Sequence, residues 1–170
     1  MKTVIYIRHG PDERRDHKYD EHLTKEGIED VKRFTEELIE KHGLPDVIYY
    51  TPFYRGRQTR KVMMKTIKKL NLDHKNIELI LEPKLGRWFT YKQSQRPDIK
   101  SSTFRKGAIT DETKEEFKER VKEQLEEVLN NGYKNVWNIT NTLVLLRVAR
   151  IKNIVRDKYV KYLDTVVLTV

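Results

Sequence analysis

The chain contains no cysteine among its 170 residues, and this absence excludes several kinds of chemistry. A protein without cysteine has no disulfide bonds, no thiolate nucleophile and no zinc site built from cysteine ligands. The absence fits a reducing compartment, where disulfides are rare. We therefore expect an intracellular, cytoplasmic protein that uses other side chains for any chemistry it performs.

Long hydrophobic runs are also missing. No apolar stretch approaches the roughly 20 residues that a transmembrane helix needs, and the N-terminus lacks the charged start and long apolar core of a signal peptide. We expect a soluble protein that does not engage a membrane. The chain is long enough for one domain with a real core and short for two, so residues 1–170 are predicted to form a single domain.

Positive charge, in contrast, is in excess. The 35 lysine and arginine residues outnumber the 26 aspartate and glutamate residues, which gives a formal net charge of +9. This balance favours a negatively charged partner, whether a phosphorylated metabolite, a nucleic acid or an acidic protein, and basicity alone does not choose among them. Residues 83–110 hold seven of these cations and one acid, so this segment contributes +6.

Short runs rich in β-branched and aromatic residues alternate with segments of helical apolar spacing. The predicted strands are residues 3–7, 47–51, 77–81, 136–140 and 165–170. Alternation of strands and helices predicts an α/β fold with a mostly parallel sheet. Residues 83–110 interrupt this alternation, and an aperiodic insertion of such length is usually either disordered or functional.

Three helices are predicted between these strands. Thr24 can cap the first, whose apolar residues recur at helical spacing. The second has its apolar stripe over residues 62–70, and the third has it over residues 117–128, with Asp111 or Thr110 as its cap. The apolar positions of all three helices are most simply explained as core.

Polar residues suited to phosphate chemistry follow four of the predicted strands. They are Arg8 and His9 after the first, Arg55 after the second, Glu82 after the third and Asn141 after the fourth. Ligands of open α/β sheets bind at the carboxyl ends of the strands, so these residues are expected to face one site. Arginine binds phosphoryl oxygens through its planar fork, a histidine can attack phosphorus, and a carboxylic acid can protonate the leaving oxygen. Such a site needs no metal ion, and we expect no cofactor.

Four segments of the chain resemble motifs of one known family. They are "YIRHG" at residues 6–10, "DEHLTKEG" at 20–27, "TPFYRGRQT" at 51–59 and "LEPKLG" at 81–86. In this order they are similar to the R-H-G, D-x-x-L-T-x-x-G, S-P-L-x-R-A-x-Q-T and L-x-E-x-x-x-G segments of the histidine phosphatase superfamily, the fourth more loosely than the others. The resemblance covers most of the chain.

The resemblance implies a phosphoglycerate mutase-like fold, which is a three-layer α/β/α sandwich with a mostly parallel central sheet. It also implies a role for four strand-end residues. His9 stands at the histidine that becomes phosphorylated, Arg8 and Arg55 stand at phosphate-binding arginines, and Glu82 stands at the proton donor. The implied activity is metal-independent hydrolysis of phosphoric monoesters through a phosphohistidine intermediate.

The chain departs from the family at the fourth motif. Where the family has T-H-G or S-H-G, this chain has Thr140, Asn141 and Thr142, and none of its five histidines lies downstream. Asn141 is expected to bind a phosphoryl oxygen without carrying charge, and loss of one preorganised donor typically costs about 100 to 1,000 fold in rate. The chain is then a weakened phosphatase or a catalytically inactive protein that binds a phosphorylated ligand. An engineered replacement of histidine is a third interpretation, but it does not explain Thr142.

The basic insertion at about residues 83–110 directly follows Glu82 and is expected to lie over the active site. There Arg87, Lys92 and Arg96 would contact an extended anionic substrate. The partner we expect is a phosphorylated anionic small molecule, and a nucleotide or RNA is the alternative. The sequence indicates neither the identity of the substrate nor the oligomeric state.

Overall fold

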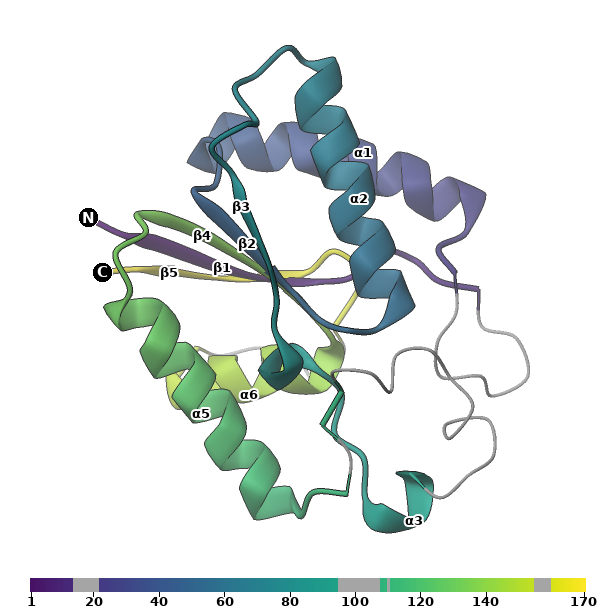
Figure 1. Cartoon of the computed structure of the whole chain (residues 1–170), viewed down its shortest axis with the longest axis vertical. Coiled ribbons are helices and arrows are strands. Elements are labelled where there is room, and N and C mark those ends of the chain that lie inside the picture. The colour runs from purple at the N-terminus through teal and green to yellow at the C-terminus, as the bar shows by residue number, and fades with distance from the viewer. Residues whose placement is uncertain (14–21, 95–107, 110, 155–159) are drawn as a thin grey trace.

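The computed structural model describes residues 1–13, 22–94, 108–109, 111–154 and 160–170, and they form one mixed α/β domain around a five-stranded sheet (Figure 1). The strands are β1 (Thr3–Arg8), β2 (Val47–Tyr50), β3 (Glu78–Leu81), β4 (Asn135–Thr140) and β5 (Thr165–Thr169). Their order is β3-β2-β4-β1-β5, in which β5 alone runs antiparallel to its neighbour. The prediction of a mostly parallel sheet is confirmed, and each strand ends within one residue of its expected bounds.

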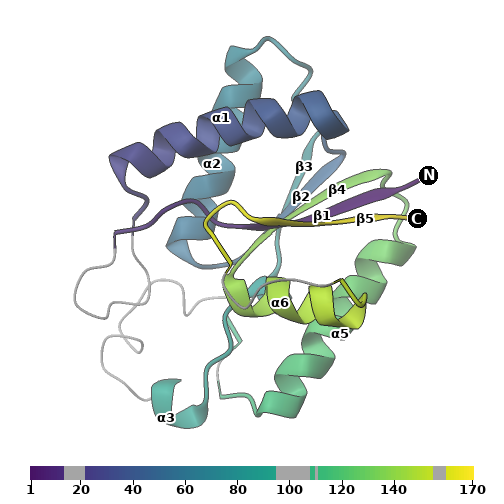
Figure 2. The same ribbon diagram turned by 180° about the vertical axis from the view of Figure 1, so that it is seen from behind.

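Helices cover both faces of the sheet. The longer ones are α1 (Lys25–His42), α2 (Tyr54–Lys69), α5 (Lys114–Asn130) and α6 (Thr142–Ile151), with the short η1 (Pro83–Leu85) and α3 (Tyr91–Ser94) between β3 and α5. α1 and α2 lie on one face, and α5 and α6 on the other (Figures 1 and 2). The three-layer α/β/α arrangement implied by the resemblance is therefore confirmed. None of the helices in the described part of the chain is long and apolar enough to cross a membrane.

The side chains of β1 alternate between the two helical layers. Val4 and Tyr6 belong to the core cluster that includes apolar residues of α5 and α6, whereas Ile5 and Ile7 belong to the cluster with residues of α1 and α2. All four are fully buried, which explains why β1 is a continuous run of apolar and aromatic residues rather than an alternating one. β1 is also held on both edges, by β4 and by β5, so its carboxyl end is fixed in place.

The N-terminal caps of α1 and α5 test the caps that were predicted from the sequence. The Oγ1 of Thr24 accepts a hydrogen bond from the backbone N–H of Gly27 at 2.8 Å, so Thr24 caps α1 as expected. The prediction that Asp111 or Thr110 caps the helix at residues 117–128 was wrong, because α5 is capped by Thr113. Thr113 and Glu116 form a capping box, in which each side chain binds the backbone N–H of the other, and a threonine three residues before a glutamate is the pattern this motif requires.

The helix α6 was not among the predicted elements. Its sequence, "TLVLLRVARI", is a short apolar run, and periodicity alone does not distinguish such a run from a buried strand. In the structure α6 packs against β1 and β5 and begins directly after β4. Its start therefore lies at the carboxyl edge of the sheet, on the side opposite the two chain ends (Figure 1).

Candidate active site

His9 lies immediately after β1 and is almost completely buried, with 3% of its surface exposed. Its backbone N–H donates to the carbonyl of Thr140 at 3.0 Å, which continues the ladder between β1 and β4 past the end of the strand. Its Nδ1 lies 2.8 Å from the carbonyl oxygen of Gly10. Since a carbonyl can only accept, Nδ1 carries the proton, and Nε2 of the neutral ring keeps its lone pair.

The surroundings of His9 keep its ring neutral. Burial lowers the pKa of His9 to about 3, and the positive charges of Arg55 and Arg8 add to this effect, while the carboxylate of Asp12 and the hydrogen bond to Gly10 oppose it. The imidazole is therefore uncharged at any pH near neutrality. A buried, neutral imidazole with one free nitrogen is the form in which histidine acts as a nucleophile.

Gly10 allows the loop after β1 to pass closely beneath α1. A Cβ atom at this position would lie 2.5 Å from Cγ2 of Val31, so any other residue would force the loop or the Val31 side chain to shift. The backbone N–H of Gly10 donates to Oγ1 of Thr59 in α2 at 3.1 Å. The glycine of the R-H-G motif thus fixes His9 between the sheet and both helices of this face.

Arg55 belongs to the first turn of α2 and reaches across to the loop after β1. Its Nη1 lies 3.1 Å from Oδ2 of Asp12, and the two side chains are only 11% and 6% exposed. The same arginine adds to the lowering of the His9 pKa, so its charge acts on the imidazole. The structure therefore brings Arg55 and His9 to the same edge of the sheet, as expected from the sequence.

Asp12 and Tyr162 also belong to this site, and neither was among the predicted site residues. Oδ1 of Asp12 accepts a hydrogen bond of 2.6 Å from the hydroxyl of Tyr162. Burial alone would raise the pKa of the Asp12 carboxyl, but the Tyr162 hydrogen bond and the neighbouring His9 and Arg55 together lower it. An acid two residues after the R-H-G motif was the available signal for Asp12, whereas nothing local indicates Tyr162.

Arg8 is held by the segment that precedes β5. Its Nη1 donates to the carbonyl of Val160, and its guanidinium lies over the ring of Tyr162, 4.0 Å from the ring centroid. The ring of His9 is 5.7 Å from that of Tyr162, measured between centroids. Arg8, Tyr162, Asp12 and Arg55 therefore form one chain of contacts beside the buried imidazole.

Glu82 follows β3 and caps the short helix η1. Its Oε1 accepts a hydrogen bond from the backbone N–H of Lys84 at 2.9 Å, and its own N–H donates to the carbonyl of Tyr50. Among the described residues, no hydrogen bond or ion pair joins the Glu82 carboxylate to His9 or to either arginine. The structure thus places Glu82 at the carboxyl edge of the sheet but leaves its role as proton donor a proposal.

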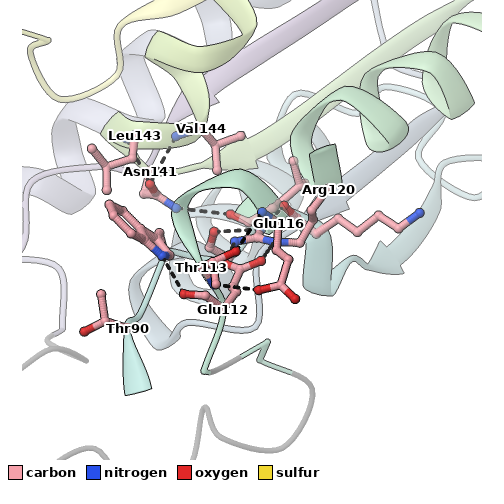
Figure 3. A network of polar contacts seen from close by, with 12 residues as sticks. Thr90, Glu112, Thr113, Glu116, Arg120, Asn141, Leu143 and Val144 are labelled. Atoms are coloured by element: carbon pink, nitrogen blue, oxygen red, sulfur yellow. Dashed lines mark hydrogen bonds and ion pairs between the residues drawn. The ribbon is translucent and has the colours of Figure 1, made fainter. Parts of the chain in front are cut away.

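Asn141 starts α6, and its side chain is engaged with backbone groups (Figure 3). Oδ1 accepts hydrogen bonds from the backbone N–H groups of Leu143 at 3.0 Å and Val144 at 3.4 Å. Nδ2 donates to the carbonyl of Leu85 at 3.2 Å, and the residue is 7% exposed. One N–H of the amide is therefore left for any phosphoryl oxygen, because Oδ1 caps α6 and the other N–H binds Leu85.

The cap predicts a stability effect at this position. We expect Asn141→Ala to lower the free energy of unfolding by about 0.5–2 kcal/mol, because two backbone N–H groups of α6 lose their acceptor. Asn141→Ser keeps an accepting oxygen at the cap and should retain most of the stability. Urea unfolding of the three proteins measures the difference, and equal loss in both variants would show that the bond to Leu85 dominates instead.

The start of the basic insertion is fastened to α5 by the network of polar contacts in Figure 3, and to β4 by the Oγ1 of Thr140, which donates to the carbonyl of Leu85 at 2.8 Å. Arg120 of α5 forms an ion pair with Glu112 and donates to the carbonyls of Lys84 and Gly86. Trp88 donates through Nε1 to the carbonyl of Glu112 at 3.0 Å. Residues 84–88 are therefore a fixed part of the domain.

Only two of the three basic residues expected to contact substrate, Arg87 and Lys92, lie in the described part of the chain. The guanidinium of Arg87 lies 5.7 Å from the centroid of the Phe89 ring, Lys92 is exposed on α3, and Arg96 lies outside the described residues. A position of the insertion over the active site is therefore still a prediction. Among the residues that the structure describes, no group of three or more histidine, aspartate or glutamate side chains is arranged to hold a metal ion.

Several solved structures share this fold. The ecdysone phosphate phosphatase of Bombyx mori in complex with tungstate has a TM-score of 0.65 at 15% identity, covering 98% of this chain and 88% of that one. A putative alpha-ribazole-5'-P phosphatase from Escherichia coli has a TM-score of 0.61 at 19% identity, covering 89% and 80%. The protein histidine phosphatase SixA complexed with tungstate has a TM-score of 0.58 at 18% identity, covering 86% and 74%.

At such identities these likenesses establish the fold, and no curated protein matches the chain. The family is established by a sequence match, since the model of the histidine phosphatase superfamily (branch 1) covers residues 4–150. That range includes His9, both arginines of the site, Glu82 and Asn141. The resemblance seen in the four sequence motifs is confirmed: this chain belongs to the histidine phosphatase superfamily.

Proposed function

We propose that the protein hydrolyses phosphoric monoesters without a metal ion, through a phosphohistidine at His9. The observation that carries the proposal is the buried, neutral imidazole whose Nδ1 proton is fixed on Gly10, beside Arg8 and Arg55. Nε2 is then the nucleophile, and the two arginines bind the phosphoryl oxygens and balance their charge. Two proteins of similar fold are known in complex with tungstate, an oxyanion resembling phosphate, which supports a phosphorylated ligand for this protein.

The proposed reaction has two steps. In the first, Nε2 of His9 attacks phosphorus, a P–N bond forms, and the P–O bond to the leaving group breaks while Glu82 gives that oxygen a proton. In the second, water attacks phosphorus, gives a proton back to Glu82, and the P–N bond breaks to release phosphate and neutral His9. Asn141 supplies at most one uncharged donor to the phosphoryl group, so we expect turnover about 100 to 1,000 fold slower than with a charged donor.

The test of this function is turnover of a chromogenic aryl phosphate by the purified protein. We expect slow hydrolysis without added metal and the same rate with a chelator present. Complete loss of activity on adding the chelator would contradict the mechanism, and absence of hydrolysis at every pH would leave a protein that binds phosphorylated ligands without turning them over.

The proton-donor role of Glu82 predicts a dependence on the leaving group. We expect Glu82→Gln to slow hydrolysis of an alkyl phosphate by about 100 to 10,000 fold, because an alkoxide needs a proton as it leaves. Hydrolysis of a nitrophenyl phosphate should change far less, since nitrophenolate leaves without one. The matched control is Glu78→Gln on β3, and equal slowing of both substrates by Glu82→Gln would assign the residue to the structure of η1 alone.

A second candidate function is binding of a nucleotide or RNA without catalysis, at a surface of α1 and α2 that does not include His9 or the two arginines of the site. It is favoured by a groove of about 450 Å³ between α1 and α2, next to the first turn of α2. Five cations line this groove, namely Lys32, Arg57, Arg60, Lys61 and Lys65. Within the described residues only Lys32 of these five has a carboxylate partner, Glu29 at 2.6 Å.

The groove predicts salt-dependent binding of a short single-stranded oligonucleotide. We expect the Arg57→Glu, Lys61→Glu double variant to weaken binding and to reduce the slope of log affinity against log salt by about 2, because each lost phosphate contact removes about 1. Lys68→Glu, Lys69→Glu at the far end of α2 is the control with the same change of charge. A third arm with Lys92→Glu tests the basic insertion, and equal weakening in all variants would indicate attraction to net charge without a site.

A further inference from the structure

The carboxylate of Asp12 stands among the groups proposed to hold the phosphoryl group. Its Oδ2 lies 3.1 Å from Nη1 of Arg55, and its Oδ1 accepts from the hydroxyl of Tyr162 at 2.6 Å. These partners come from α2 and from the segment before β5, so the carboxylate is oriented by the site and not only by its own loop. With its side chain 6% exposed, its charge is screened little by water.

The charges of the site residues in the described part of the chain determine which anion fits the site. Arg8 and Arg55 carry one positive charge each, Asp12 carries one negative charge, and His9 is neutral because burial and the arginines lower its pKa to about 3. Together these four described residues carry a net charge of +1, not counting the Glu82 carboxyl, which is proposed to be protonated when it donates to the leaving group. A doubly charged phosphoryl group beside Asp12 would face a buried like charge, which costs binding free energy.

A singly charged phosphoryl group avoids this repulsion. It balances the +1 carried by Arg8, Arg55 and Asp12 together. When it is singly protonated, its P–O–H group can also donate a hydrogen bond to a remaining lone pair of the Asp12 carboxylate. Any phosphoryl group held by Arg55 and attacked by His9 lies close to Asp12, because Asp12 contacts Arg55 and its charge acts on His9.

We infer that Asp12 makes this site selective for phosphoryl groups with one negative charge, which are phosphodiesters or monoesters that carry one proton. The inference rests on the proposed function, because it places the phosphoryl group of the substrate beside His9 and Arg55. It adds the ionic form of the substrate and a specificity-determining residue, Asp12.

Several other groups near Asp12 carry or can carry charge. Among the described residues, four of these groups are already part of the site, namely Arg8, His9, Arg55 and Tyr162. The other two are Glu13 and His22, which are joined by a hydrogen bond from the backbone N–H of Glu13 to the carbonyl of His22. His9 stays neutral above its lowered pKa, and Asp12 stays ionised because its own pKa is lowered. Each binding measurement is therefore repeated in His22→Gln, so that any pH effect of that second imidazole is identified.

The test uses two ligands that the protein cannot hydrolyse, phenylphosphonate and its methyl ester. The ester has one negative charge at every pH used, whereas phenylphosphonate changes from one charge to two as pH rises through the range in which phosphate monoesters lose their second proton, about 6 to 7. We expect the wild-type protein to bind the ester at least about tenfold more tightly than phenylphosphonate at about pH 8.5. At about pH 5 the two affinities should become similar.

Asp12→Asn keeps the size of the side chain and removes its charge. We expect it to raise the affinity for phenylphosphonate at about pH 8.5 by at least about tenfold and to leave the ester within a few fold, while Glu13→Gln, the neighbouring change of equal charge, alters neither. A wild-type protein that prefers the doubly charged ligand would overturn the inference, and so would an Asp12→Asn variant that changes both affinities alike. The comparison of the two ligands on the wild-type protein does not depend on the folding of any variant. Calorimetry measures binding without turnover, so a protein that fails to hydrolyse phosphate esters can still confirm or contradict the role of Asp12.

Discussion

Replacing His9 by asparagine is expected to reduce hydrolysis of an aryl phosphate by at least about 1,000 fold, the scale seen when a covalent nucleophile is removed. The His9 ring lies almost fully buried, and its Nδ1 donates to the carbonyl of Gly10. Asparagine can place an N–H group near the same carbonyl, so the loop after β1 keeps its hydrogen bond while the nucleophilic Nε2 is lost. Stopped-time assays with a chromogenic ester measure the change in rate.

A covalent intermediate gives this prediction a second readout. After a reaction with radiolabelled substrate is quenched in alkali, the wild-type protein should carry label that is released by acid, as expected of a P–N bond, and His9→Asn should carry none. His22→Gln is the matched control, because His22 packs on Tyr54 at the same edge of the sheet with ring centroids 4.3 Å apart. Hydrolysis by His9→Asn at the wild-type rate would remove His9 from the mechanism.

Replacing Arg120 by methionine is expected to lower the free energy of unfolding by about 3–5 kcal/mol, the range for breaking one side of a buried ion pair. Glu112, which is 7% exposed, would be left as a buried charge without its partner. The carbonyls of Lys84 and Gly86 would also lose the guanidinium that now donates to them. Urea unfolding at a fixed pH measures the loss.

A double-mutant cycle separates the pair from the packing of the arginine stem. Glu112→Gln combined with Arg120→Met removes both charges, and we expect it to be more stable than Arg120→Met alone, because no buried charge remains. Lys122→Met on the exposed side of α5 breaks pairs with Glu119 and Glu126, and because both are exposed it should cost less than about 1 kcal/mol. If Arg120→Met were as mild as Lys122→Met, the buried ion pair would not be what fastens residues 84–88 to α5.

The strands and the first helix were predictable because their signals are local. A run of apolar residues indicates β1, and a threonine three residues before Gly27 indicates the start of α1. The start of α5 is a case in which several residues suit a cap. Asp111, Thr110 and Thr113 are all cap-forming types, and the spacing of Thr113 from Glu116, which a capping box requires, distinguishes the residue that caps the helix. The sequence around α5 therefore contains the signal for its true start.

The contacts of Asp12 could not have been predicted in the same way. Asp12 meets Arg55 across 43 positions and Tyr162 across 150 positions, and no periodicity or motif relates residues so far apart. For Asn141 the sequence allows two roles and does not choose between them. Asparagine suits both a phosphate pocket and a helix cap, and only the observed bonds to Leu143 and Val144 reveal that its oxygen caps α6.

The contacts of Arg8 with Val160 and Tyr162 bear on the order in which the protein matures during synthesis. A ribosome makes the chain from its N-terminus, so the R-H-G motif emerges long before the segment that orients its arginine. A nascent chain that has reached only residue 150, the end of the family match, already contains every matched motif but lacks both Tyr162 and the strand β5 beside β1. The site therefore acquires its final arrangement of charges only when the last part of the domain has been translated and has folded against β1.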